Sequence, residues 1–142
     1  LFENANDLIQ CVDKDGNFVY VNKKWKQALG YSDKEIKNFT FRDIISKEHL
    51  PMCNKIFKQI IQGKVFDKIE TEFITKQGKK IYVEGNINSY SKDNKFFTRG
   101  IFRDITDRKK SEQNLLKLKE KYEKDLQACK IRLKEYKAKL KK

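Results

Sequence analysis

The stretch from residue 100 to residue 109 constrains the fold most, because the character of the sequence changes within it. It reads GIFRDITDRK. Before it, short runs rich in β-branched and aromatic residues are separated by turn residues, a pattern typical of paired β-strands. After it, the sequence predicts one long charged helix that continues to the last residue. A strand that runs directly into a helix is a mechanical connection, so strain in the sheet can reach the helix.

The net charge is unevenly distributed between these two parts. Residues 108–142 carry 14 Lys/Arg and 5 Asp/Glu, a balance of +9, and residues 1–107 carry 19 and 15, a balance of +4, which together give +13. A basic helix can bind nucleic acid or an anionic membrane surface. The lysines are interspersed with Glu and spread around the helix, which favours a solvated helix instead. Nucleic-acid binding by the helix is kept as an alternative.

The cysteines and the apolar runs bear on the environment of the protein. Cys11, Cys53 and Cys129 are far apart, lack metal-binding spacing and are odd in number, which argues against a disulfide framework and favours a reducing cytoplasm. No apolar run approaches the roughly 20 residues that a membrane span needs, and no signal peptide is visible. The chain begins without Met and ends within the expected helix, so we expect a piece of a longer protein.

Turn signals and apolar periodicity predict the elements of residues 1–107. The sequence DKDGN at 13–17 indicates a hairpin between strands at 8–12 and 18–22, since Asp, Asn and Gly accept left-handed backbone angles. Ser32 and Glu35 have the spacing of a capping box. A longer helix is expected at 50–61, with Pro51 in its first turn and Gly63 at its end. The remaining expected segments are a short helix at 24–29, a second short helix capped by Ser32, a third apolar turn at 39–45, and strands at 65–75, 79–90 and 96–106.

This order predicts an α+β fold. Two strands are followed by helices and then by three strands, so the strands can pair as a five-stranded antiparallel sheet with the helices on one face. The long C-terminal helix follows the sheet. We therefore expect two domains, at residues 1–107 and 108–142.

Several short motifs, in this order and spacing, resemble the PAS domain (sensory box) of bacterial and archaeal signalling proteins. They are DKDG at 13–16 before a strand that ends YVN at 20–22, LGYS at 29–32 with Glu35, Gly63 after the longer helix, KQG at 76–78, and DITDR at 104–108. The resemblance spans residues 1–108 and implies a sensory module that regulates a separate effector, such as a histidine kinase or a cyclic-nucleotide enzyme, within a two-component or similar system.

The resemblance also implies a signal junction and a ligand pocket. The junction would consist of Asp104, Ile105, Thr106 and Arg108, with Asp104 paired to Arg108 and Thr106 capping the exit helix. The alternative for the Asp104–Arg108 pair is an ordinary surface ion pair, worth about 0–1 kcal/mol. A pocket between the sheet and the longer helix would be lined by residues whose alternative role is simply to fill a core. These candidates are Ile9, Cys11, Val21, Trp25, Leu29, Phe41, Ile45, Cys53, Phe57, Ile69, Phe73, Val83 and Phe102.

No residue requires a particular cofactor. The photosensory members of the family use an Asn-Cys-Arg-Phe motif, whereas this chain has NFTFR at 38–42, so a flavin–cysteinyl adduct is not expected. Haem needs an axial ligand, and the one histidine, His49, lies at a predicted helix start, away from the pocket. A non-covalent flavin stays open. We see no acid–base pair, activated nucleophile, phosphate loop or metal cluster, and we expect no catalysis and no metal in this chain.

The C-terminal helix carries a heptad pattern that predicts a parallel homodimer. The spacing alternates between four and three residues, which indicates a left-handed coiled coil. Some core positions hold Lys119, Tyr and Cys in place of aliphatic residues. These residues make the predicted coiled coil a weak one. A single solvated helix is the alternative. The seam consists of Leu115, Tyr122, Leu126, Cys129, Leu133, Tyr136 and Leu140.

Together these observations predict a cytoplasmic sensory module. A ligand, a redox change or a partner would alter the sheet, and a dimeric helix would carry the change to an effector beyond Lys142. A ligand-free dimerisation scaffold is the main alternative.

Overall fold

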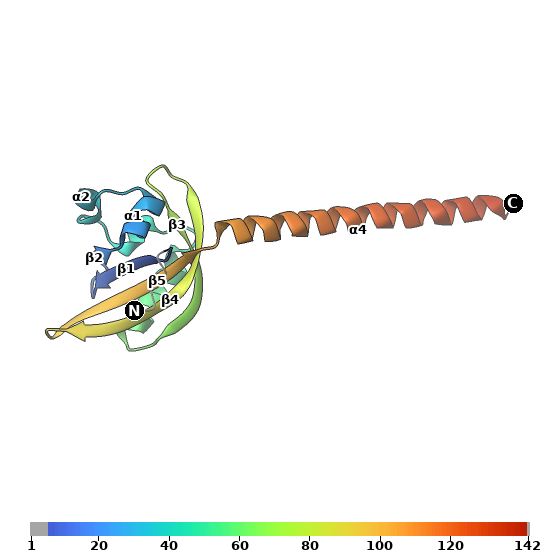
Figure 1. Cartoon of the computed structure of the whole chain (residues 1–142). Helices are drawn as coiled ribbons and strands as arrows, with labels where there is room; N and C mark the ends of the chain where they lie inside the picture. Colours follow the sequence, from blue (N-terminus) through green and yellow to red (C-terminus); the bar gives the residue numbers. More distant parts are fainter. Residues whose placement is uncertain (1–5, 142) are drawn as a thin grey trace. The chain divides into compact units, whose positions relative to one another are not determined.

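A five-stranded antiparallel sheet organises the first part of the chain. The structure is a computed structural model that describes residues 6–141. The sheet has the strand order β2-β1-β5-β4-β3, visible in Figure 1. Its strands are β1 (Leu8–Asp13), β2 (Phe18–Val21), β3 (Phe66–Ile74), β4 (Lys80–Lys92) and β5 (Lys95–Asp104). The expected α+β class and the five antiparallel strands are confirmed.

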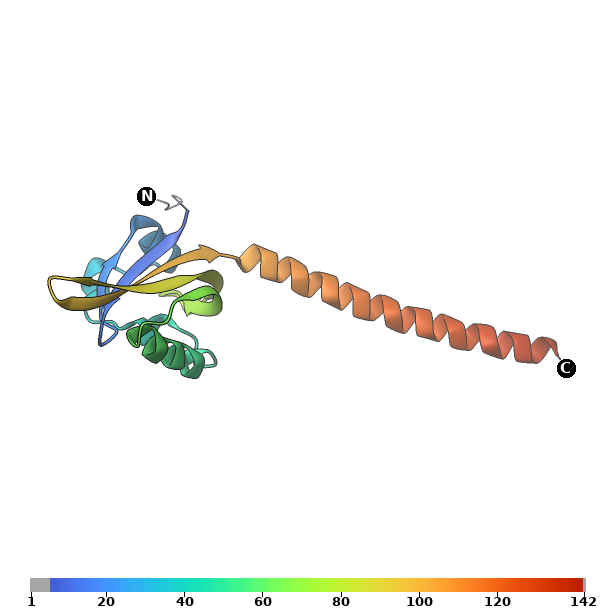
Figure 2. The same cartoon turned by 90° about the horizontal axis from the view of Figure 1, so that it is seen from below.

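Four helical segments connect β2 to β3. They are α1 (Lys23–Leu29), α2 (Asp33–Ile36), the 3₁₀ helix η1 (Phe41–Ile44) and α3 (Leu50–Ile61). In Figure 2, α3 lies along one side of the sheet. The buried side chains show why: alternate residues of the strands, such as Val12, Phe73 and Phe102, join side chains from all four helical segments in one hydrophobic core. The helical contributions to this core are Trp25, Leu29, Ile36, Phe41, Ile44, Cys53 and Phe57.

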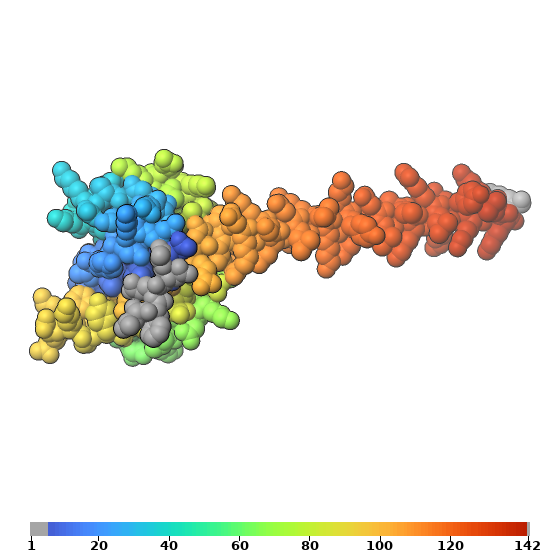
Figure 3. Space-filling model, in the orientation of Figure 1, coloured from blue at the N-terminus to red at the C-terminus, as the bar shows by residue number. Residues whose placement is uncertain are grey.

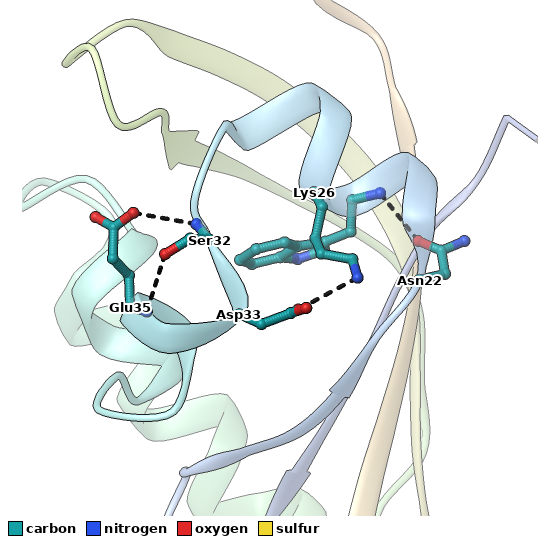
Figure 4. Close-up of polar contacts among 6 residues, drawn as sticks. Asn22, Lys26, Ser32, Asp33 and Glu35 are labelled. Atoms are coloured by element: carbon teal, nitrogen blue, oxygen red, sulfur yellow. Dashed lines mark hydrogen bonds and ion pairs between the residues drawn. The ribbon is translucent and has the colours of Figure 1, made fainter.

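Polar side chains fix where the short helices begin (Figure 4). Asn22 accepts a hydrogen bond from the backbone amide of Trp25 at the start of α1. Ser32 and Glu35 form the expected capping box at the start of α2. These bonds satisfy amides that have no partner inside the helix, which matters most in helices of only four to seven residues. Lys26 pairs with Asp33 at 3.2 Å and so joins α1 to α2.

The second part of the chain is a single helix, α4 (Thr106–Leu140). The chain divides into two compact units after Thr106. From Asp107 to Lys141 every residue except Lys109 is exposed, and Figure 3 shows side chains projecting along the helix. Within residues 6–141, no helix combines the length and the apolarity that crossing a membrane requires.

Gly85, on the interior strand β4, is the glycine where a side chain would be tolerated least. A Cβ atom there would lie 2.1 Å from the carbonyl oxygen of Ile101 and 2.7 Å from the ring of Phe102, both on β5. Only hydrogen at this position lets the two strands pair while the Phe102 ring packs over them.

We therefore predict that Gly85→Ala destabilises the fold by about 1–3 kcal/mol or more, because overpacking displaces backbone as well as side chains. The matched control is Asn88→Ala on the exposed side of the same strand, for which we expect a change within about 0.5 kcal/mol. Urea unfolding of both variants measures the difference. Equal stabilities of the two variants would contradict the packing described here.

Candidate functional site

A small cavity lies between the inner face of the sheet and α3. Its volume is about 40 Å³. That is room for about three or four water molecules, because a site of roughly 10–15 Å³ holds one. It is far below the roughly 300–1,000 Å³ of ordinary small-molecule pockets. The inner face of the domain is therefore mostly a filled core that leaves a small, largely apolar cavity.

The candidate pocket residues divide into two groups in the structure. Phe41, Ile45, Cys53, Phe57, Ile69, Phe73 and Phe102 line the cavity. Ile9, Cys11, Val21, Trp25, Leu29 and Val83 are buried but do not line it. The cavity is also lined by residues that sequence reasoning missed, namely Gln10, Val12, Ile56, Ile60, Thr71, Ile87, Thr98 and Gly100.

The side of β1 that faces the cavity differs from the expectation. Gln10 and Val12 line the cavity, whereas Ile9 and Cys11 alternate with them and so point to the opposite face of the sheet. The side chain of Gln10 accepts a hydrogen bond of 3.0 Å from the indole nitrogen of Trp25. Because residues 8–12 are all buried, polarity alternation could not indicate which set faces inward.

A second feature that the sequence did not reveal is a chain of polar side chains beside the cavity. The Ser46 hydroxyl donates to a carboxylate oxygen of Glu72 at 2.9 Å, and His49 Nε2 lies 3.4 Å from the same oxygen. His49 Nδ1 lies 3.2 Å from Thr71 Oγ1, which is 3.4 Å from Cys53 Sγ. Burial raises the pKa of the Cys53 thiol. Thr71 and Cys53 line the cavity, whereas His49 does not.

The end of β5 is held to β4 by backbone hydrogen bonds that continue past the strand. The amide of Ile105 donates to the carbonyl oxygen of Tyr82 at 2.8 Å. The amide of Tyr82 in turn donates to Thr106 Oγ1 at 3.0 Å. Ile105 and Thr106 are both buried. One residue of β4 therefore holds both the residue that follows the strand and the first residue of α4.

Asp104 completes this arrangement. Its carboxylate accepts the Thr106 amide at 2.9 Å and also the Thr106 hydroxyl. Asp104 is therefore the side chain that accepts the first amide of α4. The Thr106 hydroxyl oxygen accepts the amide of Tyr82 on β4 instead. Arg108 lies 3.6 Å from Glu112, one turn further along α4. The Asp104–Arg108 pair stays a prediction.

The heptad residues of α4 are open to solvent in the single chain. Leu115, Leu126, Leu133 and Leu140 are all exposed, as are Tyr122 and Tyr136. Cys129 is a free, exposed thiol. A row of large apolar side chains exposed at heptad spacing is the pattern that a partner helix would cover.

Comparison with known proteins gives the family. The model of the PAS domain matches residues 6–107, which is more than half of the chain. The chain belongs to the PAS domain family, and the resemblance read from the sequence is confirmed. It is 24% identical over 133 residues to sporulation kinase C of Bacillus subtilis, covering 92% of this chain and 31% of that protein. The chain thus spans about a third of the length of this curated relative.

Solved structures support the same fold. The PAS domain of an HTR-like protein from Haloarcula marismortui superposes with a TM-score of 0.63 at 23% identity, covering 74% of this chain and 91% of that one. A domain of a sensory box sensor histidine kinase/response regulator from Geobacter sulfurreducens gives a TM-score of 0.60 at 26% identity, covering 73% and 88%. The chain is therefore similar to PAS domains of sensor kinases.

We predict that Thr106→Val destabilises the domain by about 1–3 kcal/mol, because the partly buried amide of Tyr82 loses its acceptor. Thr106→Ser keeps the hydroxyl and is the matched control, for which a smaller loss is expected. Thermal or urea unfolding of the two variants compares them. If valine proved as stable as serine at this position, the hydrogen bond to Tyr82 would not contribute as described.

Proposed function

We propose that this PAS domain is a sensory module that passes a signal to a downstream effector through α4. The observation that carries the proposal is the hydrogen bonding of Tyr82 to Ile105 and Thr106, at the point where the sheet ends and the helix begins. A helix that starts without a flexible linker follows the strand before it. Asp104, Ile105, Thr106 and Arg108 form the signal junction in this proposal.

The path from the cavity to the junction runs along β5. Phe102 lines the cavity and packs edge-to-face on Phe73, with ring centroids 5.1 Å apart. Asp104 follows two residues later on the same side of the strand. A change that moves the Phe102 ring therefore acts on the strand immediately before the junction, without any chemical reaction.

The effector is proposed from the relatives. Sporulation kinase C is named as a kinase, and the Geobacter domain comes from a sensor histidine kinase/response regulator. A histidine kinase beyond Lys142 would receive the signal from α4, the helix that we predict to form a dimer. None of the three cysteines, all within residues 6–141, forms a disulfide, which agrees with a reducing cytoplasm as the proposed location of the module.

A ligand-free dimerisation scaffold is a second candidate, favoured by the small volume of the cavity. In that case the domain would only set the spacing of two effectors. Native purification, followed by an absorption spectrum and mass spectrometry of a denatured extract, separates the two candidates. A bound small molecule supports sensing by ligand, whereas its absence from every preparation supports the scaffold.

We predict that the chain forms a parallel dimer through the heptad seam and that Leu133→Glu weakens it. Leu133 is a core position of the seam, and a buried carboxylate there would oppose its twin across the dimer axis. Ile131→Glu is the matched control, because Ile131 lies outside the seam and has a similar exposure, 50% against 52%. Sedimentation at several concentrations should show a dimer for the control and dissociation for Leu133→Glu. A wild-type chain that stays monomeric at the highest concentration would refute the dimer.

We predict that Asp104→Ala uncouples input from output while the fold stays intact. The variant removes the carboxylate that accepts the Thr106 amide and hydroxyl. The output of the full-length protein is measured with and without stimulus, beside Asp67→Ala, which removes an exposed carboxylate from β3. We expect the response to be lost in the first variant and retained in the second. An unchanged response in Asp104→Ala would exclude the junction as proposed.

A further inference from the structure

The polar side chains beside the cavity form a continuous path from the surface to the cavity wall. His49 is one-third exposed, with 34% of its side chain accessible, and it immediately precedes α3. Glu72, Thr71 and Cys53 are buried. Thr71 and Cys53 line the cavity, so the path joins solvent to the cavity through the imidazole of His49.

The donors and acceptors along this path depend on the charge of His49. His49 Nε2 lies 3.4 Å from a carboxylate oxygen of Glu72, and a nitrogen without hydrogen there would set two acceptors against each other, so the contact favours a hydrogen on Nε2. In the neutral imidazole, Nδ1 then has no hydrogen and accepts from the Thr71 hydroxyl. The Cys53 thiol, whose pKa burial raises, keeps its proton and donates to Thr71 Oγ1.

Protonation of His49 reverses this order. Both ring nitrogens of an imidazolium donate, so Nδ1 donates to Thr71 Oγ1 and can no longer accept its hydrogen. The hydroxyl hydrogen must turn toward Cys53 Sγ or toward the cavity. We propose that protonation of His49 turns the Thr71 hydroxyl away from the ring, toward Cys53 and the cavity that both residues line, and so reverses the direction of hydrogen bonding along this path.

The titratable and charged groups around His49 come from three neighbouring elements. Histidine changes charge between pH 5 and 8, and His49 is the one histidine in the chain. Glu72 comes from β3 and Cys53 from α3. Glu48, in the same loop as His49, pairs with Lys80 of β4 at 3.6 Å, and a backbone hydrogen bond together with Lys80 lowers the pKa of Glu48. The Glu48 carboxylate therefore stays charged throughout this range.

The first test reads the protonation of the ring directly. The whole chain, labelled with nitrogen-15 in histidine, gives the two ring-nitrogen signals of His49 alone. We expect the neutral form to carry its hydrogen on Nε2. A neutral form with its hydrogen on Nδ1 would overturn the proposal, because Thr71 could then not donate to the ring.

The second test reads the cavity. The methyl signals of Ile56 and Ile69, which line the cavity, should shift with pH at the midpoint of the His49 titration. Thr71→Val should abolish this shift, and His49→Gln, at a partly exposed position, should abolish it as well. Thr98→Val removes another buried hydroxyl from the cavity wall and should retain the shift. A wild type without the shift, or a shift that persists in either Thr71→Val or His49→Gln, would contradict the proposal.

This inference rests on the proposed function for any role in signalling. A change at the cavity affects the output only if the domain senses a signal there. Neither test measures an output of the full-length protein. A negative result for the His49–Thr71 hydrogen bond would therefore be distinguishable from a negative result for the Asp104 junction.

Discussion

Tyr82 makes hydrogen bonds to the two residues that follow β5, and these bonds fix the start of α4 against the sheet. They extend the pairing of β4 with β5 past the end of the strand, so the first residue of α4 belongs to the sheet as much as to the helix. The burial of Ile105 and Thr106 protects these bonds from water. In the proposed function, these bonds are what would let a change in the sheet reach the start of the helix.

The interior of the sheet determines what can act on this junction. Gly85 and Gly100 leave space for the Phe102 ring, and this ring closes one side of a cavity with room for only a few water molecules. So small an opening fits the sensing of protons, water or a very small molecule better than the binding of a large cofactor. The His49–Thr71 contact gives such a cavity a link to the solvent.

Local signals in the sequence were sufficient for most of the fold. The capping box of Ser32, Pro51 in the first turn of α3 and the hairpin turn at 13–17 each act within a few residues, and the structure contains all three. The face of β1 was not predictable, because a strand buried on both sides shows no alternation. The contacts of His49 with Thr71 and Glu72 join residues more than 20 positions apart, and no local pattern announces them.

The central claim is that the strand end and the helix start are held to β4 as one structural unit. Hydrogen exchange at the amide of Ile105 tests this most directly, because that amide donates to Tyr82 across the junction. We expect this amide to be protected as strongly as the paired amides within β4 and β5, so that it exchanges only through global unfolding. Exchange as fast as that of an exposed turn such as Lys76–Gly78 would contradict it.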